Sequence, residues 1–143
     1  MIPRPTRFLV GHLAALAFIV CLTACAAGTP ATPGGPVDAR AVLAPGEVAD
    51  IAAAGIRIGF QGVLGDSRCP ADAFCIQGGD AIVRIEVLPS GGRSSSTYDL
   101  HTGDMKPVRH GDLTITLENL SPYPFSSRTI PPGEYRATLH VTR

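Results

Sequence analysis

Two cysteines, Cys69 and Cys75, are the residues of this chain whose type and spacing most directly suggest chemistry. They lie in the stretch DSRCPADAFCIQGG, where five residues separate them. Zinc sites usually have a C-x2–4-C pair with a second pair of ligands nearby, and thioredoxin-like redox motifs have the spacing C-x-x-C. Neither pattern is present, and no histidine near in sequence offers the base that a catalytic cysteine needs. The spacing therefore favours a structural disulfide over metal binding, redox chemistry or catalysis.

The residues around this pair are candidates for a binding loop. Asp66 and Arg68 flank Ser67 just before the first cysteine, and Phe74 lies between the two cysteines. A carboxylate in such a position can accept hydrogen bonds from the N–H groups of a turn. We therefore expect Asp66 and Arg68 to pair with each other or to hold the loop backbone. The candidate binding residues of this loop are Asp66, Ser67, Arg68 and Phe74.

A second constellation consists of His101, Asp104 and His110 in the stretch HTGDMKPVRH. Two imidazoles and a carboxylate can bind zinc or copper. The glycine, lysine and proline of the same stretch are typical of a solvated connection, which is the preferred interpretation because the spacing fits no recurrent metal motif. We expect no cofactor. A periplasmic metal-binding protein that uses these three residues is the alternative hypothesis.

The first 24 residues have the pattern of a bacterial export signal. A start with two arginines precedes an apolar run from Phe8 to Cys21, which is shorter than the about 20 residues of a membrane-spanning helix. The segment ends in Leu-Thr-Ala-Cys, which resembles the lipobox of bacterial lipoproteins. The resemblance implies that the signal is cut before Cys25 and that this cysteine carries acyl chains. The membrane is then a partner through this anchor.

Such an anchor places the chain in the cell envelope. Ala26, rather than aspartate, follows the cysteine, and by the lipoprotein rule this favours the outer membrane, facing the periplasm, if the source is Gram-negative. Residues 1–24 hold two arginines and no acid, so the mature chain keeps ten basic and twelve acidic residues, a formal net charge of −2. Without a clustered basic patch we expect no nucleic-acid partner. Disulfides persist in an exported compartment.

The mature chain divides into a tether and a single domain. The stretch AAGTPATPGGP, residues 26–36, has no side chain large enough for a core and is typical of a flexible linker. We therefore predict a signal peptide over residues 1–24, a lipid-anchored tether over residues 25–39 and a folded domain over residues 40–143.

The domain has the alternation of short β-strands throughout. Strands are expected at residues 41–43, 56–61, 81–88, 95–100, 112–120 and 135–142, separated by Gly- and Pro-rich turns. Ile58, Ile85, Ile115 and Leu139 are among the residues expected to face inward, and residues 95–100 are polar enough for an edge strand. Residues 48–54 could form a brief helical turn. The pattern predicts an all-β fold, a small antiparallel sandwich or barrel of about six to seven strands.

Three segments carry a resemblance to a family. GDSRCPADAFCIQGGDAIVRIEV, LENLSPYP and IPPGEYRATLHVT are similar to a group of small, uncharacterised bacterial lipoproteins and secreted proteins. The group shares a D-S-R-C-P…C-x-x-G-G/A-x-A element and a closing P-Y-P…Y-x-A-T-L-x-V strand. The resemblance covers most of residues 41–143 and implies a β domain without implying an activity. Members often have Trp where this chain has Gln77, so no role for an aromatic side chain carries over there.

The sequence holds no catalytic set. The serines at positions 94–96 follow two glycines, but they lack the G-x-S-x-G strand–turn–helix setting of a hydrolase. We therefore expect a non-enzymatic binding or structural module of the envelope. Tyr123 and Phe125, in a proline-rich segment, are expected to pack over the end of the sandwich.

Overall fold

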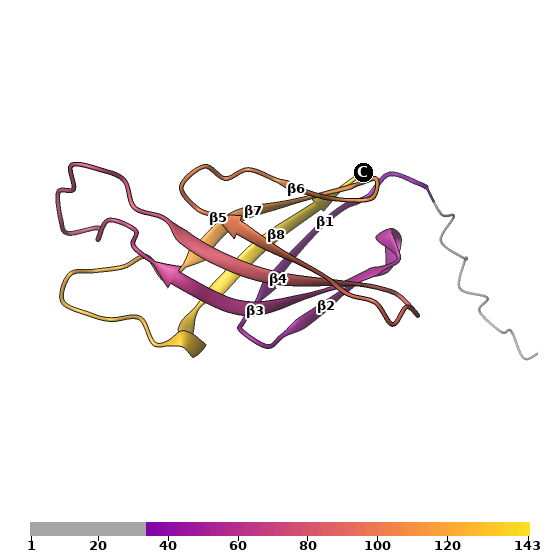
Figure 1. The fold of residues 1–143 in the computed structure, drawn as a ribbon, viewed down its shortest axis with the longest axis horizontal. Helices are drawn as coiled ribbons and strands as arrows, with labels where there is room; N and C mark the ends of the chain where they lie inside the picture. Colours follow the sequence, from indigo (N-terminus) through magenta and orange to yellow (C-terminus); the bar gives the residue numbers. More distant parts are fainter. Residues whose placement is uncertain (1–33) are drawn as a thin grey trace, which may run out of the picture.

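In the computed structural model, residues 34–143 are described, and they form two four-stranded antiparallel sheets packed face to face (Figure 1). The predicted signal peptide, the candidate lipidation site Cys25 and the tether as far as residue 33 lie outside the described residues. Within residues 34–143, no helix has the length and apolar character needed to cross a bilayer. The predicted all-β sandwich is confirmed.

The first sheet has the strand order β1-β8-β7-β6 and the second has the order β2-β3-β4-β5. The strands of the first sheet are β1 (Asp38–Leu43), β6 (Val108–His110), β7 (Leu113–Ser121) and β8 (Arg136–Thr142). The strands of the second sheet are β2 (Val48–Ile51), β3 (Ile56–Asp66), β4 (Ala81–Pro89) and β5 (Ser96–His101). Two short 3-10 turns complete the fold, η1 (Ala52–Ala54) and η2 (Pro132–Glu134). The polar strand β5 lies at a sheet edge, as its sequence predicts.

The core lies between the sheets and uses the alternation that the sequence predicts. In β4 every second residue from Ala81 to Val87 is buried, and β7 and β8 alternate in the same way. Phe60 of β3 is the largest of the fully buried side chains. Burial of each such side chain contributes about 1.5–3 kcal/mol. The strands are therefore held by their inward residues, which leaves the connections free for other roles.

Two elements differ from the sequence-based expectation. Val48–Ile51 forms an edge strand instead of a helical turn, because its backbone pairs with β3, with Val48 opposite Gly59. Only Ala52–Ala54 turn, and Gly55 ends that turn with φ 66°. The strand β6 lies where a solvated connection was expected, because the tight turn at Gly111 brings it back onto β7. The first strand begins at Asp38, ahead of the predicted domain start at residue 40.

The two ends of the sandwich carry different connections (Figure 1). Residues 67–80, 102–107 and 122–135 gather at one end, which we call the loop end. The start of the described chain, η1 and the turns that join β4 to β5 and β6 to β7 lie at the opposite end, which we call the N-terminal end. The sandwich thus separates the start of the described chain from its longest loops.

Candidate functional site

A buried ion pair lies at the base of the loop end. Among residues 34–143, Arg68 is the buried charged residue, with 6% of its side chain exposed, and 11% of the Asp66 side chain is exposed. Arg68 donates from Nε to Oδ1 of Asp66 at 2.9 Å and from Nη2 to Oδ2 at 2.7 Å. This bidentate geometry is the strong form of an arginine–carboxylate pair. The predicted pairing of these two residues is confirmed.

The same guanidinium ties two of these connections together. It donates from Nη1 to the carbonyl of Leu120 at 2.7 Å and from Nη2 to the carbonyl of Pro122 at 3.0 Å. The Tyr123 ring covers it, with Cζ of Arg68 5.2 Å from the ring centroid. On the other side, the Tyr135 hydroxyl donates to Oδ2 of Asp66 at 3.0 Å. Arg68 therefore joins the start of residues 67–80 to both ends of residues 122–135.

The carboxylate of this cluster stays ionised. Burial alone would raise the pKa of Asp66, but the hydrogen bonds and charge of Arg68 lower it below its ordinary value. The pKa of Tyr135 is raised, because burial and the neighbouring Asp66 carboxylate both oppose its ionisation. The charged groups of Asp66 and Arg68 are thus engaged with the protein itself. They hold the loop, and the surface available to a ligand lies elsewhere.

The disulfide loop is fixed at its base and at its middle. Cys69 and Cys75 form a disulfide with their Cα atoms 6.0 Å apart. Ser126 donates from its backbone N to Oδ1 of Asp72 at 2.8 Å and from Oγ to Oδ2 at 2.6 Å. The backbone N of Ala71 donates to the carbonyl of Pro124 at 2.9 Å. The two bonds from Ser126 lower the pKa of Asp72, and all three bonds dock the loop on residues 122–135.

One of the two glycines that end the D-S-R-C-P…G-G motif lies where no side chain can fit. Ser67 donates from its backbone N to the carbonyl of Asp80 at 2.7 Å, which closes the base of residues 67–80. Gly79 passes so close to this contact that a Cβ atom there would lie 1.5 Å from the carbonyl oxygen of Ser67. Gly78 has open space at the same position. Only Gly79 is therefore required by close backbone approach.

A group of polar contacts centred on Asp80 and His101 joins residues 102–107 to the base of residues 67–80. We call it the Asp80–His101 latch. Oδ2 of Asp80 lies 2.5 Å from Nδ1 of His101, and its Oδ1 accepts from Oγ1 of Thr102 at 3.1 Å and the backbone N of Gly103 at 2.8 Å. Burial acts to raise the pKa of Asp80, but these bonds lower it below 3.8. The hydrogen bond to Asp80 raises the pKa of His101 above 6.5.

The predicted metal ligands do not come together as a site. His101 is engaged by Asp80, Asp104 pairs with Lys106 at 2.9 Å, and Nδ1 of His110 lies 3.0 Å from the hydroxyl of Tyr98. In the part of the chain that the structure describes, no three His, Cys, Asp or Glu side chains converge in a way that could hold a metal ion. The expected set fails because β6 carries His110 away into a hairpin with β7.

Large apolar side chains are exposed at the loop end. Phe74 and Ile76 are 97% and 98% exposed, so neither packs on the rest of the protein. Tyr123 and Phe125 are about half exposed, so the expectation that they pack over the end of the sandwich holds in part. The Tyr123 ring packs over the Arg68 guanidinium, and the rest of both aromatic side chains faces solvent. Sequence reasoning selected Phe74 and missed Ile76, although both lie in the same Gly- and Pro-rich stretch.

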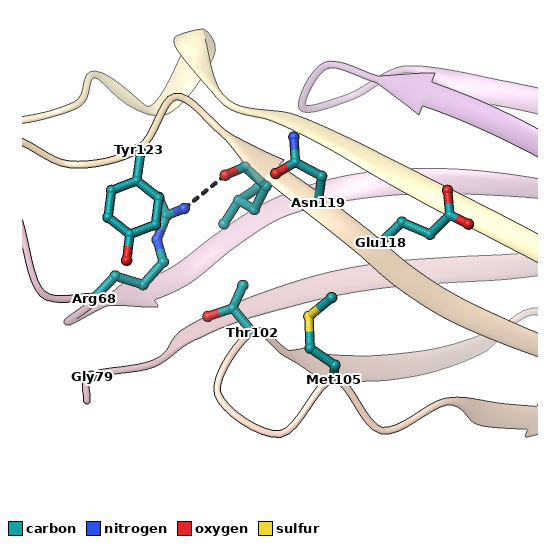
Figure 2. A pocket seen from close by; sticks show the side chains of 8 residues that line it. Arg68, Gly79, Thr102, Met105, Glu118, Asn119 and Tyr123 are labelled. Atoms are coloured by element: carbon teal, nitrogen blue, oxygen red, sulfur yellow. Dashed lines mark hydrogen bonds between the residues drawn. The ribbon is translucent and has the colours of Figure 1, made fainter. Parts of the chain in front are cut away.

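A hollow of about 210 Å³ lies between β7 and residues 102–107 (Figure 2). Figure 2 shows the Tyr123 ring beside the hydrogen-bonded Arg68 at one end, and Met105 and Thr102 on the opposite wall. Two of its polar side chains are already engaged, since Thr102 donates to Asp80 and Glu118 accepts from Nε of Arg40 at 2.9 Å. The lining includes no cysteine, serine or histidine that could act as a nucleophile or base.

A further hollow of about 300 Å³ separates Pro70 from residues 124–130. Its lining includes the engaged pair Asp66 and Arg68, together with Tyr135 and the ring of Phe125. The hollow lies between the disulfide loop and residues 122–135. Its lining offers no acid–base pair other than Asp66 and Arg68, which are bonded to each other.

Protein-family models, curated proteins and solved structures were compared with the chain, and none of them matches it.

Proposed function

We propose that this protein is a lipid-anchored module of the bacterial cell envelope that binds a partner through its loop end and performs no catalysis. One observation carries the proposal: Phe74 and Ile76 are almost fully exposed on a loop that a disulfide and the Asp72–Ser126 contacts hold in place. Clustered apolar side chains on the surface mark sites of interaction. Ordering such a loop without a binding role would cost free energy and gain nothing for the core.

The position of the start of the described chain supports a loop end that faces away from the membrane. The start of the described chain lies at the N-terminal end of the sandwich, opposite the disulfide loop (Figure 1). With acyl chains on Cys25, the N-terminal end faces the membrane, at a distance of at most about 30 Å for the intervening segment fully extended. The loop end then points away from that membrane and toward other envelope components.

The motif shared with the small bacterial lipoproteins is consistent with a scaffold for such a loop. Asp66 and Arg68 form its buried base, the cysteines close it, and Gly79 allows the close approach of its two strands. We propose that the chain belongs to this group and that members share the braced loop. The side chains presented between the cysteines and just after them then set the partner of each member.

The anchor is tested by fractionation of the full chain in a Gram-negative host. We expect the wild-type protein in the membrane fraction, with acyl chains on Cys25 by mass spectrometry, and Cys25→Ser in the soluble fraction. Unmodified Cys25 in a soluble wild-type protein would remove the anchor from the proposal.

The binding role is tested by native electrophoresis of the full chain extracted from its own envelope in mild detergent. We expect the wild type in a species larger than the monomer, and the double variant Phe74→Ser/Ile76→Ser at the position of the monomer. Val42→Ser/Val48→Ser is the matched control, because both valines are exposed and lie outside the three loop-end connections. A wild type that migrates as a monomer contradicts a binding role.

A further inference from the structure

The strongest feature that the proposed function leaves undefined is the partner of the loop end. Among residues 34–143, eight large apolar side chains are exposed, and five of them belong to the three loop-end connections. These five are Phe74, Ile76, Met105, Tyr123 and Phe125. We propose that Phe74 and Ile76 insert into an uncharged apolar groove on a second envelope protein. This inference rests on the proposed binding role and names its partner by chemistry.

The shape of the surface favours a groove. At 97% and 98% exposure, Phe74 and Ile76 protrude with their apolar area free on all sides. Side chains of this kind are fully buried only when a partner surrounds them, as in the pockets where interface hot spots lie. Tyr123 and Phe125 lie on the neighbouring connection, which Ala71 and Asp72 contact directly, and they can cover the rim of the groove.

The loop is also organised before binding. The disulfide and the bonds from Asp72 and Ala71 already restrict the backbone that carries Phe74. Because the loop is already ordered, association loses less conformational entropy. More of the free energy gained by burying apolar surface then contributes to affinity.

The charges of the loop end argue against a lipid surface. Its three connections carry three basic and four acidic residues, a formal charge of −1. Every lysine or arginine in them has a carboxylate partner: Arg68 has Asp66, Lys106 has Asp104 and Arg128 has Glu134. Attraction to anionic lipids requires free basic residues near the surface. Two copies placed loop end to loop end would bring two surfaces of net charge −1 together. An uncharged groove on a different protein therefore suits this surface better than a lipid bilayer or a second copy.

The test uses the full acylated chain in its native envelope, with benzoylphenylalanine as a photo-crosslinking probe in place of one residue. We expect probes at Phe74 and Ile76 to form one discrete adduct with another protein, and a probe at Val48 to form none. With the probe at Phe74, Ile76→Ser and the pair Cys69→Ser/Cys75→Ser should each reduce the adduct strongly.

The partner identified in that adduct is then purified and its affinity for the acylated chain in detergent is measured. Ile76→Ser should weaken binding by about tenfold or more, and Val48→Ser should leave it unchanged. Affinity should change little between about 50 and about 500 mM salt, because no charge pair is expected to form across the groove.

Three results overturn the inference while keeping the loop end as a binding surface: a lipid adduct, an adduct with the mass of two copies, or a steep salt dependence. Equal adducts from Phe74 and Val48 show non-specific contact and overturn it as well. The absence of any adduct, together with a monomer in native electrophoresis, means that the proposed binding role has failed.

Discussion

The loop end and the N-terminal end join the strands of one sandwich in different ways. At the N-terminal end the connections are short, and Gly55, Gly91 and Gly111 adopt the left-handed backbone that tight turns require. At the loop end two of the connections, residues 67–80 and 122–135, are long, and a disulfide, a buried ion pair and side-chain hydrogen bonds hold them. None of the large exposed apolar side chains lies in the η1, β4–β5 or β6–β7 turns of the N-terminal end.

The difference shows what long connections need in order to stay ordered. Fixing the backbone of each residue costs about 1–2 kcal/mol. The loop end cannot offset this cost by burying Phe74 and Ile76, because both side chains face outward. Polar and covalent contacts replace the missing burial, and the apolar side chains remain available to a partner. The N-terminal end meets no such demand, so simple turns suffice.

The largest effect is expected from removing the guanidinium at the base of the loop end. Arg68→Met removes the charged partner of the largely buried Asp66 carboxylate and the side-chain donor to the carbonyl of Leu120. Breaking a buried pair in this way costs about 3–5 kcal/mol. Guanidinium-induced unfolding at neutral pH measures the loss. Arg84→Met is the control, since its pair with Asp99 is substantially exposed, and its loss should be much smaller. Equal losses would erase the distinction between this cluster and an ordinary surface ion pair.

The next effect concerns close backbone approach. Gly79→Ala should destabilise the protein by about 3 kcal/mol, toward the upper end of overpacking costs, because the new Cβ meets the carbonyl oxygen of Ser67. Gly78→Ala, one residue away, meets open space and should stay within about 0.5 kcal/mol. Thermal unfolding of both variants gives the comparison. Similar melting temperatures for the two variants would contradict the conclusion that the close contact with Ser67 requires glycine at position 79.

Removal of the disulfide should have a smaller effect that is confined to one end. Cys69→Ser/Cys75→Ser should cost about 2 kcal/mol, because the bridge closes a short loop. Amide hydrogen exchange should speed up for residues 71–76 and stay unchanged in the turn at Gly111. Faster exchange at both ends alike would mean that the loop end is not a separately braced region.

The smallest effect is the pH dependence of the Asp80–His101 latch. The raised pKa of His101 means that its contribution is fully present below 6.5 and is lost as pH rises through the folded value. The lowered pKa of Asp80 means that its contribution is present above 3.8 and is lost as pH falls through the folded value. The latch is therefore strongest between these two limits. NMR titration of His101 should show its pKa move back toward 6.5 in Asp80→Asn, and an unchanged value would contradict the latch.

Much of this fold could be predicted because its signals are local. Alternation with a period of two marks the strands and selects inward residues such as Ile85 and Leu139, and both are fully buried. The disulfide was expected from the cysteine spacing and from the export signal that the sequence predicts. The strand β6 could not be predicted in this way, because Val108–His110 has too few residues to show a period and forms only by pairing with β7.

The site was predicted less completely, because its contacts join distant parts of the chain. Asp66 and Arg68 are two residues apart, so their pairing could be expected from sequence. The partners of Arg68 at Leu120 and Pro122 are set by where β7 ends relative to β3, which depends on how the two sheets pack. The exposure of Ile76 likewise depends on where Asp72 and Ser126 dock the loop.

The sequence by itself determined the all-β class, the inward face of most strands and the cysteine clamp, since each depends on residue type and short-range spacing. Only the tertiary structure decided that Arg68 is a buried brace and that His101, Asp104 and His110 form no common site. It also decided that the disulfide loop lies opposite the start of the described chain, with Phe74 and Ile76 pointing outward. These outcomes depend on which strands are neighbours and at which end each loop emerges, and no local pattern in the chain specifies that order.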